Sequence, residues 1–319
     1  MVLLRRRGET LAAFVDEWWS LYAEPNLERS TLRVYAHVWN RHARPRLGHI
    51  RLGELTPQTI ARFRAELEAT GVGPESIRKT MTMLQGVLQR AVEWQHVGSN
   101  AVAVVRKPPV ARQRAVRAIP PDLVEAMRAR LLARGRRRDA TLLVVLAYAG
   151  VRPQEALALE WRHVRERTLL VEQALSDGRV KALKNRRRPR AVDLLEPLRA
   201  DLAAFGESRA ADSRAPVIAR RDGGFWRETD WRNWRRRVFA PAAAEVGLHG
   251  ARPYDLRHAF ASLLIHEGRH SIVEIAGQLG NNPTVCLDVY AHEMAEARGG
   301  EPIGAEDLIR AARGRAGWP

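Results

Sequence analysis

Apolar residues recur at three- and four-residue intervals through most of the first hundred positions. The pattern is clearest in four segments, at residues 11–22, 31–42, 60–69 and 76–94. Helix-start signals precede the last three of these segments, and they are Ser30, Thr56 followed by Pro57, and Pro74. The spacing therefore predicts four amphipathic helices that pack as a small bundle.

The pattern breaks at residues 105–119, which read VRKPPVARQRAVRAI. This stretch has no apolar period and contains a Pro-Pro pair among basic residues, so we interpret it as a basic interdomain linker. The predicted domains are residues 1–110, a helical bundle, and residues 111–319, a second domain.

Helical periodicity returns in the second region and is interrupted once. Pro120, Pro121 and Asp122 start a predicted helix, and a second, buried one ends at Gly150. Two short predicted strands, TLLVEQAL and RAVDL, flank a turn-rich basic connection. Helices are predicted at 195–205 and in the AEDLIRAAR tail, and an irregular Arg-rich segment holds Trp226, Trp231 and Trp234. The fold class is mainly α, with one small antiparallel β-sheet in a mostly helical second domain.

The stretch from residue 254 to residue 290 separates core positions from chemical ones. On a helix, one face of its first half is apolar, with Leu256, Phe260, Leu263 and Leu264. The other face carries Tyr254, Arg257, His258 and Ala261. A further helix is predicted to start at Pro283 behind an Asn282 cap, which places Tyr290 about two turns in.

Net charge narrows the class of partner. The chain carries a net charge of +17 over 319 residues, with 49 arginines and 4 lysines. This excess favours a polyanion, and nucleic acid is the first candidate. Cys286 is the only cysteine, which excludes an intramolecular disulfide or a cysteine-cluster metal site and suits the cytoplasm. The longest apolar run, residues 142–151, is too short for a membrane helix.

Basic residues far apart in the sequence suit chemistry on a phosphate. Two guanidiniums, at Arg152 and Arg257, can bind the non-bridging oxygens and stabilise a five-coordinate transition state. A lysine, Lys184, can protonate a leaving alkoxide, and Tyr290 can form a covalent ester as nucleophile. No metal-ligand spacing appears, and cations in these positions make a metal unnecessary. Lys181, three residues before Lys184, is the alternative lysine.

Five motifs in order carry a family resemblance. They are AGVRPQEALALEW, K-N-x-x-R-x-R-x-V, YDLRHAFA, LGN, and a tyrosine nine residues after Asn281. Together with TLAAFVDEWW and STLRVYAHVWNRHARPRLGHIRLGELT, they resemble the phage-integrase family of tyrosine site-specific recombinases. The resemblance covers nearly the whole chain. It implies a SAM-like core-binding domain followed by a catalytic domain, and no arm-binding domain ahead of them.

The resemblance also implies residue roles. Arg152 and Arg257 become the phosphate-clamping arginines, Glu155 the brace of Arg152, Lys184 the acid that protonates the 5′-hydroxyl, and Tyr290 the nucleophile of a 3′-phosphotyrosyl link. The family usually has His where Tyr254 stands, and His or Trp where Asn281 stands. Both substitutes can hydrogen-bond a phosphate, but neither accepts a proton well near neutral pH. The general base therefore stays open, with His258 as the candidate on the same helix.

The implied partner is double-stranded DNA, bound by a homo-tetramer that exchanges strands, with a monomer free in solution. No cofactor or membrane is implied, and the tail after Tyr290 is expected to dock on a neighbouring subunit. Lys181 and the run Arg186, Arg187 and Arg188 are candidate DNA-backbone contacts, or else a solvated charge run. Two alternatives are a catalytically weakened, DNA-binding or regulatory relative and a type IB topoisomerase-like enzyme.

Overall fold

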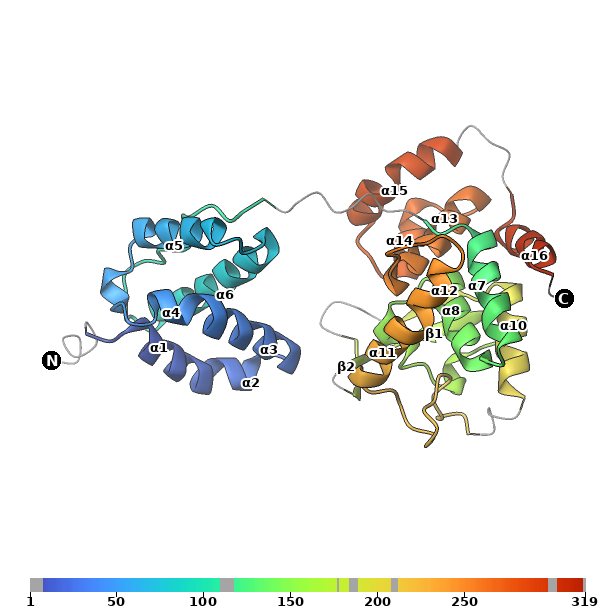
Figure 1. Ribbon diagram of the computed structural model, residues 1–319, viewed down its shortest axis with the longest axis horizontal. Helices are drawn as coiled ribbons and strands as arrows, with labels where there is room; N and C mark the ends of the chain where they lie inside the picture. Colours follow the sequence, from blue (N-terminus) through green and yellow to red (C-terminus); the bar gives the residue numbers. More distant parts are fainter. Residues whose placement is uncertain are drawn as a thin grey trace. The chain divides into compact units, whose positions relative to one another are not determined.

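The chain forms two compact units, residues Met1–Arg114 and Ala115–Pro319, each with its own hydrophobic core (Figure 1). The structure, a computed structural model, describes residues 8–109, 118–176, 178–183, 189–207, 212–297 and 303–317. The predicted domain boundary, between residues 110 and 111, lies outside these described residues.

The described part of unit 1 has the four helices that the apolar period predicts, and two of them, residues 11–26 and 29–47, are each divided into consecutive elements by a π-turn. Its helical elements are α1 (Leu11–Trp18), η1 (Trp19–Ala23), α2 (Glu24–Asn26), α3 (Arg29–Val38), η2 (Trp39–Ala43), α4 (Arg44–Leu47), η3 (Leu52–Glu54), α5 (Pro57–Ala69) and α6 (Pro74–Glu93). The predicted Thr56 cap is confirmed, because its hydroxyl accepts from the Thr59 amide at 3.1 Å. The core is built on α1 and α6, whose apolar faces meet.

Three π-helical turns interrupt longer helices in the part of the chain that the structure describes. Residues 19–23, 39–43 and 235–239 are each π-helical, and each is followed two residues later by a proline, at Pro25, Pro45 and Pro241. A proline lacks the amide hydrogen and its ring collides with the carbonyl four residues back. Widening the preceding turn moves that carbonyl away, so the helix continues through the proline.

Unit 2 packs its helices around a buried one. The helical elements are α7 (Pro121–Ala133), α8 (Arg137–Tyr148), α9 (Pro153–Ala156), η4 (Trp161–His163), α10 (Glu196–Gly206), α11 (Glu228–Trp234), η5 (Arg235–Phe239), α12 (Ala240–Ala244), η6 (Pro253–Asp255), α13 (Leu256–Glu267), α14 (Ile272–Leu279), α15 (Pro283–Ala297) and α16 (Ala305–Arg315). Helix α8 is buried from Asp139 to its end and contacts α7, α10 and α13. The segment around Trp231 and Trp234, predicted to be irregular, is helical, because the two indoles stack at 5.3 Å and are buried in the core.

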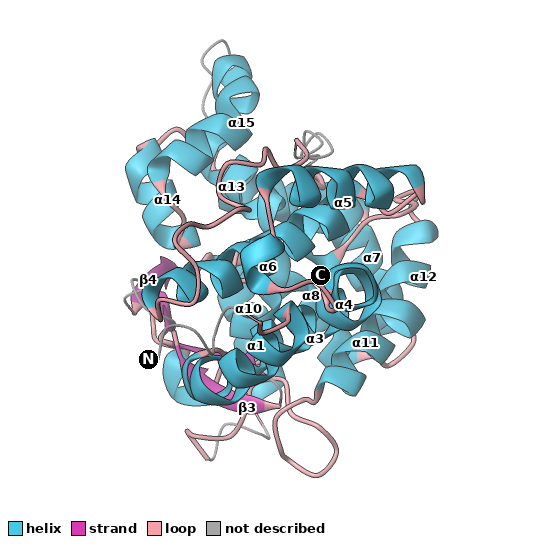
Figure 2. Ribbon diagram, turned by 90° about the vertical axis from the view of Figure 1, so that its left-hand side faces the viewer, coloured by secondary structure: helices cyan, strands magenta, loops and turns pink. Residues whose placement is uncertain are grey.

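In the described part of unit 2, four short strands form two antiparallel pairs. Strand β1 (Thr168–Val171) pairs with β4 (Arg190–Asp193), and β2 (Gln173–Ser176) pairs with β3 (Arg179–Ala182). The prediction of two strands in one sheet was wrong in detail, since TLLVEQAL divides into β1 and β2. Strand β3 has no buried position, so its sequence carries no apolar alternation. Strand β4 lies beside α14 (Figure 2).

Helix α16 packs within its own chain. It contacts α7, α10 and α13 and buries Ala305, Ile309 and Ala312 (Figure 1). Arg313 adds hydrogen bonds to the Glu125 carboxylate at 3.2 Å and to Asp201 at 2.5 Å. The expected docking of the tail on a neighbouring subunit stays a prediction, because the structure holds a single chain.

Candidate active site

Arg152 is presented by a sharp exit from α8. Gly150 has a φ of +55°, and a Cβ at this position would lie 2.4 Å from Phe260, so a side chain is excluded on both grounds. Arg152 then precedes Pro153, the first residue of α9. Its guanidinium donates to the Glu155 carboxylate at 3.0 Å and to the Gly280 carbonyl at 2.8 Å. The side chain is thereby fixed from two directions.

Arg257 lies in the first turn of α13 and is only 2% exposed. It donates to the Gly150 carbonyl at 2.5 Å and also to the Leu279 carbonyl. Burial, with the nearby positive charge of Arg152, lowers the pKa of Arg257 to about 10. The guanidinium is nevertheless charged at neutral pH, and its acceptors offset the loss of hydration.

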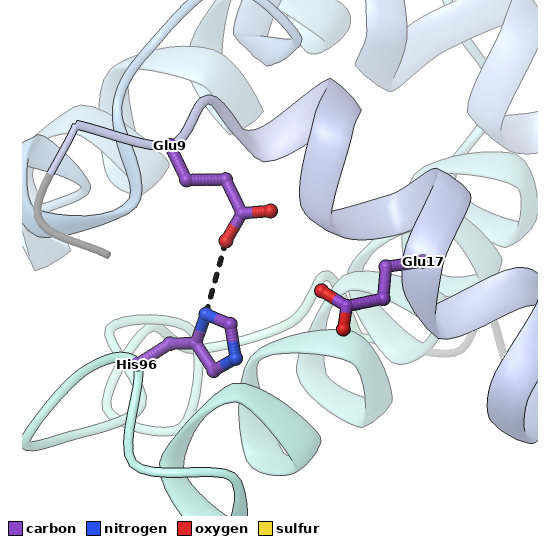
Figure 3. A group of neighbouring side chains, drawn as sticks. All are labelled: Glu9, Glu17 and His96. Atoms are coloured by element: carbon purple, nitrogen blue, oxygen red, sulfur yellow. Dashed lines mark hydrogen bonds and ion pairs between the residues drawn. The ribbon is translucent and has the colours of Figure 1, made fainter. Parts of the chain in front are cut away.

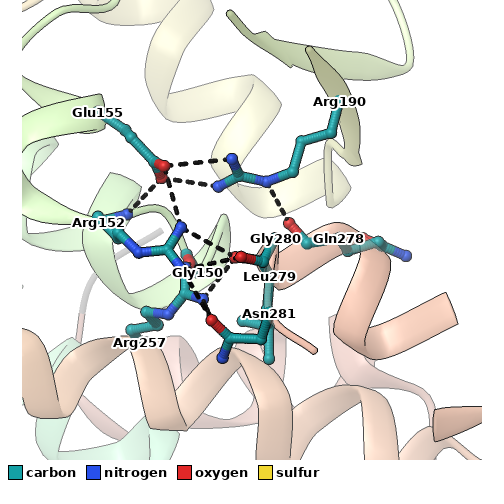
Figure 4. Close-up of polar contacts among 9 residues, drawn as sticks. All are labelled: Gly150, Arg152, Glu155, Arg190, Arg257, Gln278, Leu279, Gly280 and Asn281. Atoms are coloured by element: carbon teal, nitrogen blue, oxygen red, sulfur yellow. Dashed lines mark hydrogen bonds and ion pairs between the residues drawn. The ribbon is translucent and has the colours of Figure 1, made fainter. Parts of the chain in front are cut away.

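Asn281 joins the two arginines. Its Oδ1 accepts from Arg152 Nη2 at 2.7 Å and from Arg257 Nη2 at 3.0 Å (Figure 4). Two guanidiniums thus converge on a single oxygen, which is the arrangement that binds a phosphate oxygen. We call Arg152, Arg257 and Asn281 the arginine clamp.

Glu155 braces this clamp from behind and is shared by two arginines. The carboxylate is 1% exposed and accepts from the Arg152 amide at 2.8 Å. Arg190 binds it bidentately, at 3.2 and 2.7 Å, as Figure 4 shows. Burial alone would raise the pKa of Glu155, but the hydrogen bonds and charges of Arg190 and Arg152 outweigh burial and lower it. Glu155 is therefore a carboxylate over the whole neutral range.

Tyr290 and His258 form the second half of the site. The Tyr290 hydroxyl lies 2.7 Å from His258 Nδ1, and the Tyr290 side chain is 2% exposed. Burial lowers the pKa of His258 to about 4. Burial also raises the pKa of Tyr290, and the positive charge of Arg257 offsets part of this rise. His258 is consequently neutral at pH 7, and its Nδ1 can accept the phenolic proton when Nε2 carries the ring proton.

The structure describes some of the remaining predicted residues and not others. Tyr254 is 41% exposed, and its ring lies 5.9 Å from that of His258. Lys181 lies in β3. Lys184, the predicted general acid, and residues 186–188 lie outside the described residues. Cys286 is fully buried.

Arg190 is the site residue that the sequence reasoning did not single out. It opens β4 and has the same strand parity as Val192, which is fully buried. A charged residue on the inward face of a strand needs a buried partner, and this periodicity was the available signal.

One group in unit 1 has the composition of a metal site. Glu9, Glu17 and His96 each offer a ligand atom, and these atoms lie within 4.8 Å of one another. In Figure 3 the Glu9 carboxylate bonds His96 Nδ1 at 3.0 Å, while Glu17 approaches from α1. The ring of His96 also packs on Phe14 at 4.8 Å. We interpret the group as a structural contact that links the start of α1 to the turn after α6.

Among the helices in the described part of the chain, none is long and apolar enough to cross a membrane.

Comparison with known proteins gives a consistent picture. Residues 10–67 match the N-terminal SAM-like domain of phage integrases. The ICEBs1 integrase of Bacillus subtilis (strain 168) is 24% identical over 268 residues, which cover 80% of this chain and 72% of that protein.

Solved structures share the fold over most of the chain. The Tn1549 transposon integrase in complex with transposon right end DNA has a TM-score of 0.74 at 14% identity, covering 91% of this chain and 98% of that one. A lambda integrase dimer bound to a core site has a TM-score of 0.68 at 18% identity, covering 91% and 81%. A lambda integrase tetramer bound to a Holliday junction has a TM-score of 0.67 at 17% identity, covering 90% and 80%. The mainly helical fold with small antiparallel sheets is that of these integrases.

Proposed function

We propose that this chain, a tyrosine recombinase of the phage integrase family, cuts and rejoins double-stranded DNA at a specific site through a 3′-phosphotyrosyl intermediate. The observation that carries the proposal is the convergence of two arginines on one oxygen, with a histidine-bonded tyrosine on the adjoining helices. Residues 1–110 would hold DNA as the core-binding domain, and residues 111–319 would carry the catalysis.

The scissile phosphate takes the place of the Asn281 oxygen. Its non-bridging oxygens accept from Arg152 and Arg257, which neutralise the ground state and stabilise the additional charge of the five-coordinate transition state. Once displaced, the Asn281 amide can turn and donate to the phosphate through Nδ2. Asn281 thus lies between the two arginines in the free protein and can bind the phosphate in the complex.

The chemical step moves one proton at each end of the phosphorus. The Tyr290 oxygen attacks phosphorus as its proton passes to His258 Nδ1, and the bond from phosphorus to the 5′-oxygen breaks. Lys184 gives a proton to that leaving oxygen. The 3′-phosphotyrosyl ester keeps the bond energy for rejoining. A new 5′-hydroxyl then attacks phosphorus and gives its proton to Lys184, while His258 returns its proton to the departing Tyr290 oxygen.

Charge and relatives support the rest of the proposal. The net charge of +17 favours binding to the DNA backbone, to which Lys181, Arg186, Arg187 and Arg188 would contribute. A homo-tetramer would exchange strands, as the lambda integrase tetramer on a Holliday junction illustrates. The protein would act in the cytoplasm.

A covalent capture experiment tests the function. The protein is incubated with random-sequence duplexes, each nicked so that the short cleaved strand dissociates, and detergent-stable protein–DNA adducts are recovered and sequenced. We expect adducts with a shared sequence, formed by the wild type and absent with Tyr290→Phe.

Each other outcome has a defined meaning. Binding without any adduct would leave a DNA-binding relative and contradict the enzyme. An adduct that persists in Tyr290→Phe would contradict the nucleophile. Relaxation of plasmids that lack the recovered sequence would identify a type IB topoisomerase-like activity instead.

A further inference from the structure

We propose that Arg190 is a positioning residue for the clamp: it holds Glu155 and the turn that ends α14, so that the Arg152 guanidinium is aimed at the phosphate. This inference rests on the proposed function. Arg190 does not itself bond Asn281, whose oxygen marks the position of the phosphate oxygen.

The Arg190 guanidinium joins three separate segments. It stands on β4, its two terminal nitrogens bind both oxygens of Glu155 on α9, and its Nε donates to the Gln278 carbonyl of α14 at 2.7 Å. The side chain is only 10% exposed. These contacts hold the Arg190 guanidinium between β4, α9 and α14.

The C-terminal end of α14 and Gly280, the residue that follows it, offer three carbonyls to three arginines. The Gln278 carbonyl accepts from Arg190, that of Leu279 from Arg257, and that of Gly280 from Arg152. These carbonyls form the negative end of the α14 dipole, which favours guanidinium groups there. Arg190 therefore fixes the same turn that orients both clamp arginines.

The backbone of Gly280 also lies close to the Arg190 side chain. Gly280 has a φ of +61°, and a Cβ on it would lie 3.0 Å from the Arg190 guanidinium carbon. Glycine is thus required by backbone conformation and by the approach of Arg190 together. A shorter side chain at position 190 would leave this contact empty.

Sharing of Glu155 sets the aim of Arg152. Each carboxylate oxygen accepts once from Arg152, through Nη1 or the backbone amide, and once from Arg190. Without Arg190, Glu155 is free to rotate and bind the Arg152 guanidinium with both oxygens. That rotation would draw Arg152 Nη2 away from the phosphate, and the Glu155 carboxylate would neutralise more of the Arg152 charge.

The test uses Arg190→Gln and Arg190→Lys on a duplex recovered by covalent capture with the wild type. We expect single-turnover adduct formation to fall about 10²-fold for Arg190→Gln, because a small misplacement of a charged clamp is enough to do so. Arg190→Lys keeps the charge but cannot bind Glu155 bidentately, so we expect an intermediate rate. The DNA dissociation constant should stay within about 3-fold of wild type, because no DNA contact is removed.

A neutral phosphate analogue separates positioning from mere structural support. A methylphosphonate at the scissile position carries no negative charge for the clamp to neutralise. If Arg190 acts through the clamp, the defect of Arg190→Gln should become roughly tenfold smaller on this substrate. The defect of Arg152→Gln should shrink in the same way, whereas that of Tyr290→Phe should not.

The matched control is Arg199→Gln, an exposed arginine on α10 that pairs loosely with Glu196 at 3.7 Å. We expect it to cleave like wild type. Equal rates for Arg190→Gln and Arg199→Gln would overturn the proposal, as would a loss of DNA affinity that matches the loss of rate. If Arg190→Gln fails to fold, Arg190→Lys decides, and a wild-type rate with it overturns the proposal. Failure of the proposed function is recognised separately, because then the wild type forms no adduct.

Discussion

The two halves of the site are built in opposite ways. The arginine clamp is over-determined: Arg152 and Arg257 donate to backbone carbonyls, to Glu155 and to Asn281, and Arg190 supports them from behind. The nucleophile half depends on one hydrogen bond, between Tyr290 and His258. Buried guanidiniums need many acceptors to remain charged, whereas proton transfer needs one short contact to a neutral base. The clamp is therefore pre-organised, and the nucleophile is poised.

The largest effect is expected from breaking the clamp. Arg257→Gln removes a positive charge that stabilises the negative charge developing on the phosphate in the transition state. Adduct formation should therefore fall about 10²- to 10³-fold in a single-turnover assay. Arg269→Gln, an exposed arginine just beyond α13, is the control. If both variants cleave equally, the clamp does not act on the phosphate.

The nucleophile half is tested by His258→Gln, for which we expect a loss of about 10²-fold, typical of a removed general base. Because the pKa of His258 is lowered to about 4, the base stays neutral in mild acid. The cleavage rate of the wild type should therefore not fall through His258 between pH 8 and pH 5. A decline centred on the ordinary histidine pKa would show that this ring is not the buried base.

A smaller effect should sharpen the role of Asn281. In Asn281→Asp, a carboxylate would stand between the two arginines and compete with the phosphate, and the added charge should slow cleavage about 10-fold. The loss should appear mainly as weaker productive binding, measured from the DNA concentration at half-maximal rate. Asn281→Ala lacks the competing oxygen, and if it is impaired as much as Asn281→Asp, competition is not the cause.

The last effect concerns folding rather than rate. Since burial lowers the pKa of His258, the unfolded chain binds a proton that the folded chain does not as pH falls from the ordinary histidine value to about 4. Stability is therefore lost on acidification, by about 2 kcal/mol at pH 5 relative to pH 7. Urea unfolding at both pH values should show that His258→Gln loses less than the wild type by this amount, and equal losses would contradict the assignment.

Sequence patterns anticipated much of this molecule. Apolar spacing located the four helices of unit 1, and the face with Leu256, Phe260, Leu263 and Leu264 is buried as predicted. The start of α15 at Pro283 is confirmed, with the Asn282 side chain accepting from the Thr284 amide at 2.9 Å. Strand β3 and helix α11 were missed, because one has no buried face and the other follows Gly- and Arg-rich sequence.

The sequence by itself determined which chemical groups are available: two arginines, a glutamate, a histidine and a tyrosine, in an order that resembles the integrases. Only the tertiary structure decided how they combine. It placed His258 rather than Tyr254 on the Tyr290 hydroxyl, and it brought Arg190 to Glu155 across 35 positions of sequence. Such contacts depend on how a strand, a turn and two helices pack, and local patterns encode each element without encoding their meeting point.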